Sequence, residues 1–227
     1  MEGAEKLERA HGTSVEIVIA ELSRIEGMRE VEERITHLER LDMLINNAGY
    51  WEPGLFWKHS PDRLEAMIMV HNVAPARFIC AALPGMLRRD KGDIISVSST
   101  GAYFNLATME NYGATKAYLI SFTESLHVAL MGTGIRVQVL IPGPTVTQFH
   151  SRLGADFTRE QRGWMKPEAV VDRSFGALEK AEVVCIPSLR SRLIVNLACL
   201  LPRPIYYRVM KAMGERIKKR WDEIETA

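Results

Sequence analysis

Short β-branched apolar runs alternate with longer helical stretches along this chain, and that alternation constrains the fold most strongly. Strands are predicted at residues 14–22, 41–49, 92–100, 135–143 and 182–187. Apolar residues at helical spacing predict helices at residues 3–12, 25–38, 61–87, 111–131 and 167–180, with a bend near Pro75. This order is typical of βαβ units, so the sequence predicts an α/β fold around a parallel sheet.

Composition removes several classes of function. The net charge is +1, and no Lys/Arg cluster with interleaved aromatic residues occurs, so no nucleic-acid partner is expected. Cys80, Cys185 and Cys199 lie far apart without metal-ligand spacing, which predicts buried, reduced thiols, no metal site and a cytoplasmic location. The charged first residues are not a signal peptide, and no run of about 18 apolar residues predicts a membrane span.

The chain divides by composition into residues 1–190, the predicted α/β domain, and a C-terminal extension at 191–227. The extension is apolar through Leu201, is broken at Pro202 and Pro204, and then becomes basic and amphipathic. Such a segment suits a lid over an apolar pocket or peripheral attachment to a membrane surface. The alternative is a helix that packs on the sheet or on a second subunit of a homo-oligomer.

Tyr112 and Lys116 stand four positions apart at the start of a predicted helix, so their side chains leave the same face. A phenol titrates near pH ~10, and a neighbouring ammonium lowers that pKa, which makes tyrosine a usable general acid/base. Ser99 ends a predicted strand thirteen positions before Tyr112, where parallel strands deliver site residues. Its hydroxyl can bond a substrate carbonyl that Tyr112 protonates.

Asn46-Asn47-Ala48-Gly49 follows another predicted strand, and by itself it reads as a turn. Together with the Asn72-Val73 pair and the segments ISVSST, YGATK and VLIPGPTVTQF, it resembles the short-chain dehydrogenase/reductase family in order and spacing. The resemblance is clear from about Glu5 to Phe149. It implies a Rossmann-like doubly wound parallel sheet and an NAD(P)(H)-dependent oxidoreductase that interconverts a carbonyl and an alcohol, with NADP slightly preferred.

The resemblance also implies roles for individual residues. Tyr112 would be the acid/base, Ser99 would polarise the carbonyl, Lys116 would hold the nicotinamide ribose, and Asn72 would anchor a water that relays protons. The cofactor would contact residues at two strand ends besides Tyr112 and Lys116, namely Asn46, Asn47, Ala48, Gly49, Pro142, Gly143, Thr145 and Thr147.

Less specific candidates surround these residues. Trp51, Phe56 and Trp57 line a substrate pocket or merely pack the loop. His71 is interpreted as a surface or packing residue rather than a base. The similarity of the C-terminal tail to lipid-metabolising members of the family implies a lipophilic substrate, such as a steroid or fatty-acyl carbonyl.

One departure from the family affects the cofactor. No Thr-Gly-x-x-x-Gly-x-Gly turn precedes Asn46, and Glu21 is a weak candidate for the acidic adenine contact. The usual first β-α-β unit, roughly 35 residues on the ~30-residue scale of such units, is expected to be lacking. Either the gene start was assigned at an internal methionine or the chain is a truncated relative. A second hypothesis is therefore an impaired remnant that binds a partner, although the complete set of four catalytic residues favours an enzyme.

Overall fold

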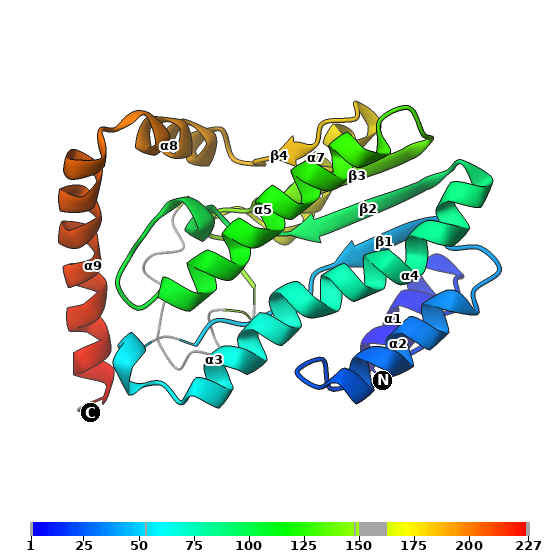
Figure 1. The fold of residues 1–227 in the computed structure, drawn as a ribbon, viewed down its shortest axis with the longest axis horizontal. Helices are drawn as coiled ribbons and strands as arrows, with labels where there is room; N and C mark the ends of the chain where they lie inside the picture. The colour runs from blue at the N-terminus through cyan, green and yellow to red at the C-terminus, as the bar shows by residue number, and fades with distance from the viewer. Residues whose placement is uncertain (1, 53, 148, 150–162, 226–227) are drawn as a thin grey trace.

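A computed structural model shows a four-stranded sheet at the centre of the molecule (Figure 1). The structure describes residues 2–52, 54–147, 149 and 163–225, with side chains up to Glu215. All neighbouring strands are parallel, in the order β1-β2-β3-β4. Their bounds are β1 Met43–Asn46, β2 Gly92–Val97, β3 Ile135–Leu140 and β4 Val184–Cys185. These four strands fall within predicted segments.

Helices cover both faces of the sheet because successive strand residues point to opposite sides. On one face, α4 (Ala74–Arg89) and α5 (Glu110–Leu130) pack against Ile94 and Val137. On the other, α7 (Pro167–Glu179) packs against Ile95 and Leu140, as Figure 1 shows. The predicted Rossmann-like doubly wound parallel sheet is confirmed for the described residues.

The predicted long helix is irregular just before Pro75. It consists of α3 (Pro61–Ile68), a π-helical turn at Met69–Val73 and α4. The π turn inserts an extra residue where Pro75 lacks a backbone donor, and such turns are frequent at functional sites. It places Val70, His71 and Asn72 inside the fold.

Residues 14–22 do not form the predicted strand. They run between α1 (Glu2–His11) and α2 (Ile25–Thr36) without sheet pairing, although the preceding helix ends at Gly12, φ +62°, as predicted. A strand needs a partner for its backbone groups, and among the described residues β1 has only β2. Ile17, Val18 and Ile19 are consequently 51%, 45% and 90% exposed.

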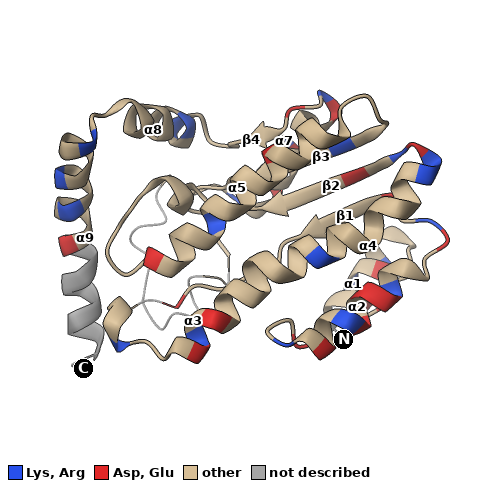
Figure 2. Ribbon diagram, viewed as in Figure 1, with Lys and Arg blue, Asp and Glu red and all other residues tan. Residues whose placement is uncertain are grey.

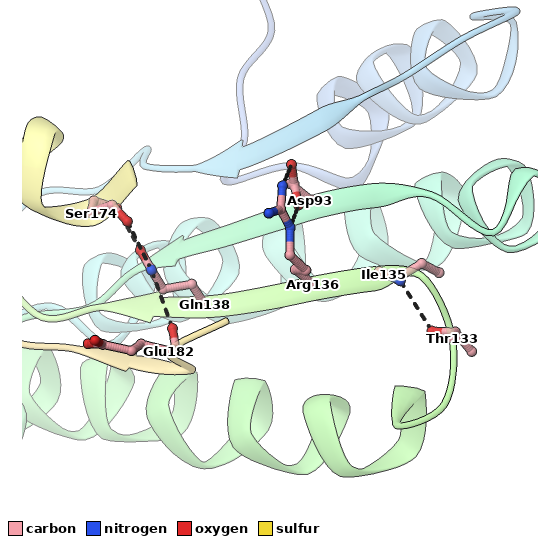
Figure 3. Close-up of polar contacts among 7 residues, drawn as sticks. All are labelled: Asp93, Thr133, Ile135, Arg136, Gln138, Ser174 and Glu182. Atoms are coloured by element: carbon pink, nitrogen blue, oxygen red, sulfur yellow. Dashed lines mark hydrogen bonds and ion pairs between the residues drawn. The ribbon is translucent and has the colours of Figure 1, made fainter. Parts of the chain in front are cut away.

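A buried amide fastens α7 to the sheet (Figure 3). Gln138 on β3 is fully buried, donates to the Ser174 carbonyl at 3.1 Å, and accepts from the Ser174 hydroxyl at 2.6 Å. Nearby, Arg136 and Asp93 form a bidentate pair between β3 and β2, at 2.7 and 2.8 Å. The nitrogen and the oxygen of the Gln138 side-chain amide are both hydrogen-bonded, as a buried polar side chain requires.

The C-terminal segment forms α8 (Leu189–Leu200) and α9 (Arg203–Glu225), which runs along the end of the molecule opposite α1 (Figure 1). Pro202 separates the helices as predicted, but Pro204 does not break the chain. It lies in the first turn of α9, where a missing N–H costs nothing. The Tyr206 hydroxyl donates to the Tyr103 carbonyl at 2.7 Å and anchors α9 to the loop before α5. The division at residue 190 stays a prediction.

The expectation of buried cysteines needs correction, and one helix bears on the expectation about membrane spans. Cys185 is buried, but Cys80 and Cys199 are exposed, because each lies on the outer side of its helix. The helical stretch Pro61–Arg89 is also long and apolar enough to cross a membrane by length and composition alone. Half of its most apolar window is buried inside the fold, which is what a core helix of a parallel sheet requires.

Candidate active site

The side chains that the sequence singled out meet at the carboxyl ends of β1 and β2. β2 ends at Val97, Ser99 caps the short 3-10 helix Thr100–Tyr103, and Tyr112 lies in the first turn of α5. Gly101 brings these elements together, because a Cβ there would lie 3.3 Å from the Tyr112 ring and 3.4 Å from Ser99 Oγ. Parallel sheets bind ligands at this edge.

Tyr112 is buried among aromatic rings. Its ring centroid lies 6.3 Å from that of Trp51 and 6.2 Å from that of Phe149. Burial raises the pKa of the phenol, and a hydrogen bond with Ser99 acts in the opposite direction. The expected lowering by Lys116 is not seen in this structure, because the Lys116 ammonium lies over the ring, 5.8 Å from its centroid, and bonds elsewhere.

Lys116 is buried with its ammonium donating to the Val97 carbonyl at 3.0 Å. Burial lowers the pKa of Lys116 to about 8. The side chain therefore remains mostly protonated at neutral pH and lies between the end of β2 and Tyr112. It is placed to donate hydrogen bonds to a hydroxylated ligand at this strand end.

Asn72 projects from the π turn toward α5. Its side-chain amide donates to the Thr115 carbonyl at 2.8 Å, and the residue is 7% exposed. This bond joins the π turn to α5 at Thr115, the residue before Lys116. The structure thus brings Asn72, Ser99, Tyr112 and Lys116 to one place, as the sequence predicted, while their individual roles stay predictions.

The sequence left two interpretations of His71 open, a surface residue or a packing residue, and the structure shows the packing residue. It is not a surface residue: the imidazole is fully buried, and its ring lies edge-on to Tyr112 with centroids 5.8 Å apart. Burial, together with the Lys116 charge, lowers the pKa of His71 to about 3. The signal was present, since His71 interrupts an apolar helical run just before Asn72.

The backbone of the turn after β1 is exposed to solvent beside His71 and Lys116. Asn46 is buried, and its side-chain nitrogen has no hydrogen-bond partner within the described part of the chain. Asn47, Ala48 and Gly49 are exposed. A Cβ at Gly49 would lie 2.9 Å from His71 Nε2 and 3.4 Å from Lys116 Nζ, so glycine keeps the approach to both groups open.

The second predicted cofactor segment follows β3. Pro142 accepts from the Thr100 backbone N–H at 3.0 Å, and the Thr145 hydroxyl donates to the Gly143 carbonyl at 2.9 Å. Gly143 packs under α8, where a Cβ would approach Ser191 Oγ to 2.5 Å. The hydroxyl of Thr147 accepts from the Phe149 N–H at 3.3 Å. These residues border the same end of the sheet as β1 and β2.

Other candidates lie apart from the cluster. Glu21 accepts from the backbone and hydroxyl of Ser23 at 3.0 and 2.8 Å, which stabilises a turn. Trp57 is 74% exposed and Phe56 is 48% exposed, so of the three aromatic candidates only Trp51 contacts Tyr112. Within the described residues, no three His, Cys, Asp or Glu side chains gather into a metal site.

Comparison with known proteins agrees with this geometry. A family model described as short chain dehydrogenase matches residues 1–157. The NADP-dependent 3-hydroxy acid dehydrogenase YdfG of Escherichia coli K12 is 35% identical over 134 residues, which are 56% of this chain and 53% of that protein. The chain thus spans about half the length of the curated relatives it matches.

Two solved structures are similar over more of the chain. The short-chain dehydrogenase of Sphingobium yanoikuyae, in complex with NADPH, is 31% identical with a TM-score of 0.76, covering 82% of this chain and 72% of that one. A 7β-hydroxysteroid dehydrogenase is 25% identical with a TM-score of 0.81, covering 91% and 81%. Shared fold, motifs and sequence establish that this chain belongs to the short-chain dehydrogenase/reductase family.

Proposed function

We propose that this protein is an NAD(P)(H)-dependent oxidoreductase that interconverts a carbonyl and an alcohol, with Tyr112 as general acid/base. The observation that carries the proposal is the burial of Tyr112 between Ser99 and Lys116 at the carboxyl end of β2. A proton donor, a polarising hydroxyl and a fixed cation at one strand end are what carbonyl reduction needs.

Each group would act on one atom of the reaction. A bound nicotinamide cofactor supplies the hydride for the carbonyl carbon. The Tyr112 hydroxyl gives its proton to the carbonyl oxygen and takes it back in the reverse direction. Ser99 donates to the same oxygen and orients it. Because burial raises the pKa of Tyr112, the free protein holds the protonated phenol, which is the form that donates a proton when the carbonyl is reduced.

The residues present fit one part of the cofactor. Lys116, Tyr112 and the open turn at Gly49 would hold the nicotinamide ribose, and the unpartnered amide of Asn46 would serve the adenosine side. The Pro142–Thr147 segment would border the nicotinamide. No glycine-rich turn that would bind the pyrophosphate precedes Asn46. NADP is preferred in the proposal because the Sphingobium structure holds NADPH and YdfG is NADP-dependent.

We further propose a lipophilic substrate. The Tyr112 ring lies beside the rings of Trp51 and Phe149, an apolar setting that favours a hydrophobic carbonyl. The similarity to a 7β-hydroxysteroid dehydrogenase supports the same class. A panel of steroid ketones, long-chain aldehydes and open-chain sugars, with NADPH consumption as the measurement, tests this. Turnover of only the sugars would refute the apolar preference while leaving the oxidoreductase proposal intact.

Peripheral membrane contact is a separate part of the proposal, and it rests on α8. Four leucines along this helix are 54–80% exposed: Leu189, Leu193, Leu197 and Leu200. Residues 183–214 contain five basic residues and no acidic residue, and the blue segments of the ribbon in Figure 2 mark basic residues on both α8 and α9. An apolar stripe beside positive charge suits an anionic lipid surface.

Vesicle co-sedimentation tests that contact. The chain should bind vesicles that contain phosphatidylserine, and a Leu193→Ser, Leu197→Ser variant should bind them less. Equal binding by both proteins, or none by either, would refute the membrane contact. A chain that instead forms a dimer lost in the same variant would show that the stripe is a subunit contact. The expected homo-oligomer and cytoplasmic location stay predictions.

A further inference from the structure

His71 is a buried titratable side chain that the proposed reaction does not use. It is fully buried in the π turn, beside Asn72. Three groups face its ring: Tyr50 and Tyr112, both edge-on at 5.7 and 5.8 Å between centroids, and the charged Lys116. No acidic group contributes to its environment among the described residues. An imidazole so placed must satisfy both nitrogens internally.

The hydrogen bonds of His71 define its tautomer. The Tyr50 backbone N–H donates to Nε2 at 3.0 Å, so Nε2 carries a lone pair. Nδ1 lies 2.8 Å from Thr115 Oγ1, and that hydroxyl donates its own proton to the Tyr112 carbonyl at 2.8 Å. Thr115 therefore accepts from Nδ1–H. A chain of bonds runs from the Gly49–Tyr50 turn through His71 and Thr115 to the backbone of Tyr112.

We propose that His71 is a positioning residue: as a neutral Nδ1–H imidazole, it holds the turn after β1 against the first turn of α5. It thereby sets Tyr112 and Lys116 relative to the open backbone at Gly49. A bond from Tyr50 N–H exists only while Nε2 is unprotonated, and burial beside Lys116 lowers the pKa of His71 to about 3. The positional role rests on the proposed function, but the bonding pattern does not.

Nitrogen-15 NMR of the imidazoles tests the bonding pattern without any activity. The chain has six histidines, and the His71 signals are those that disappear in His71→Gln. Their shifts should report a protonated Nδ1 and an unprotonated Nε2, unchanged between about pH 5 and pH 8, where an ordinary imidazole titrates. Titration in that range, or a proton on Nε2, would overturn the proposal.

A double-mutant cycle tests the positional role. His71→Leu and Thr115→Val each break the same chain of bonds, so each should lower kcat about tenfold or more, as a small misplacement of reacting groups does. The double variant should be no slower than the slower single variant, because both changes remove one connection. His71→Gln keeps an acceptor for Tyr50 N–H and should recover part of the rate.

The control is Thr123→Val, a buried hydroxyl on α5 without a partner among the described residues, whose loss should not lower kcat. Rate losses that simply add, or that follow the loss of thermal stability in all variants, would refute positioning. Absence of turnover in the unmodified chain would instead refute the proposed function, and the NMR result would still decide the state of His71.

Discussion

Two sets of residues differ in how completely they are buried and hydrogen-bonded: the polar cluster at the carboxyl end of β1, and the apolar residues Ile19 and Ile45, which no strand among the described residues covers. At the carboxyl end, Asn72, Lys116 and His71 are buried, and their hydrogen bonds join three elements. In contrast, Ile45 on the unpaired side of β1 is 49% exposed, and Ile19, in the segment between α1 and α2, is 90% exposed. The first region is therefore a buried, hydrogen-bonded cluster, whereas the second consists of apolar side chains that remain exposed to solvent.

The difference shows that local sequence and tertiary packing impose separate requirements. Ile17 and Ile19 alternate as strand residues do, yet without a neighbouring strand their backbone groups have no ladder to join. Lys116 is of a residue type that is rarely buried, but the Val97 carbonyl accepts a hydrogen bond from its ammonium, which allows the side chain to be buried. Whether each of these residues is buried depends on the strand or hydrogen-bond partner that the fold supplies, and not on residue type alone.

The largest expected effect is loss of the proton donor in the ordered region. Tyr112→Phe should reduce turnover by ~10²–10⁴-fold, the usual contribution of a general acid, while leaving NADPH binding nearly unchanged. Steady-state kinetics at saturating NADPH measures it, and Lys116→Ala, which should impair turnover and NADPH binding together, is the comparison. Activity in Tyr112→Phe equal to that of the unmodified protein would remove the proposed mechanism.

The second prediction concerns cofactor affinity, which depends on both regions. The ordered region offers ribose contacts, but residues 1–45 contain no glycine-rich turn that could bind the pyrophosphate of NADPH. Several charge-assisted hydrogen bonds at ~1.5–3 kcal/mol each are missing, and each ~1.4 kcal/mol is tenfold. Calorimetric titration of the 227-residue chain with NADPH should therefore give a dissociation constant in the millimolar range. A micromolar value for this chain would show that the phosphates are held by other groups.

A third prediction separates stability from function at Lys116. Burial lowers its pKa from 10.5 to about 8, so below pH 8 the folded state carries the cost of a buried charge. Above pH 8 the unfolded chain binds the extra proton, and the free energy of unfolding rises with pH until about 10.5. Each unit by which the pKa of Lys116 is lowered corresponds to ~1.4 kcal/mol of destabilisation at pH 7, and Lys116→Met removes this cost. The same substitution also removes the hydrogen bond to Val97. The free energy of unfolding should therefore be higher in Lys116→Met by about 2 kcal/mol at pH 7.

Denaturant unfolding at pH 7 and pH 10 measures this difference, which should shrink at the higher pH. Lys211→Met is the matched control, because its side chain is 80% exposed on α9. A Lys116→Met protein less stable than the unmodified chain at pH 7 would mean that the bond to Val97 outweighs the cost of burial.

The smallest expected effect concerns the unpaired segment between α1 and α2. Ile19→Ser removes an exposed isoleucine whose burial between chains would contribute ~2 kcal/mol, so self-association should weaken about 30-fold. Sedimentation velocity over a range of concentrations measures it, with Trp57→Ser as a control at another exposed apolar residue. Unchanged association in Ile19→Ser would show that chains meet through another surface.

Much of the fold follows from periodicity alone. The buried runs at residues 92–100 and 135–143 became β2 and β3, because strands covered on both faces must be apolar throughout. The sequence also predicted that Ser99 and Tyr112 lie close together. Ser99 follows the end of a strand, and Tyr112 lies in the first turn of the next helix. Their individual chemistry came from the family resemblance and awaits the experiments above.

Tertiary structure decided what depends on groups far apart in sequence. The sequence determined that residues 14–22 favour a strand, but only the absence of a partner among the described residues showed that they remain unpaired. It placed His71 beside Asn72, but only the approach of Tyr50 and Thr115 gave that ring its bonds. The physical reason is the same in both cases. Local patterns set which groups need partners, while burial and hydrogen bonding depend on which partners the whole fold supplies.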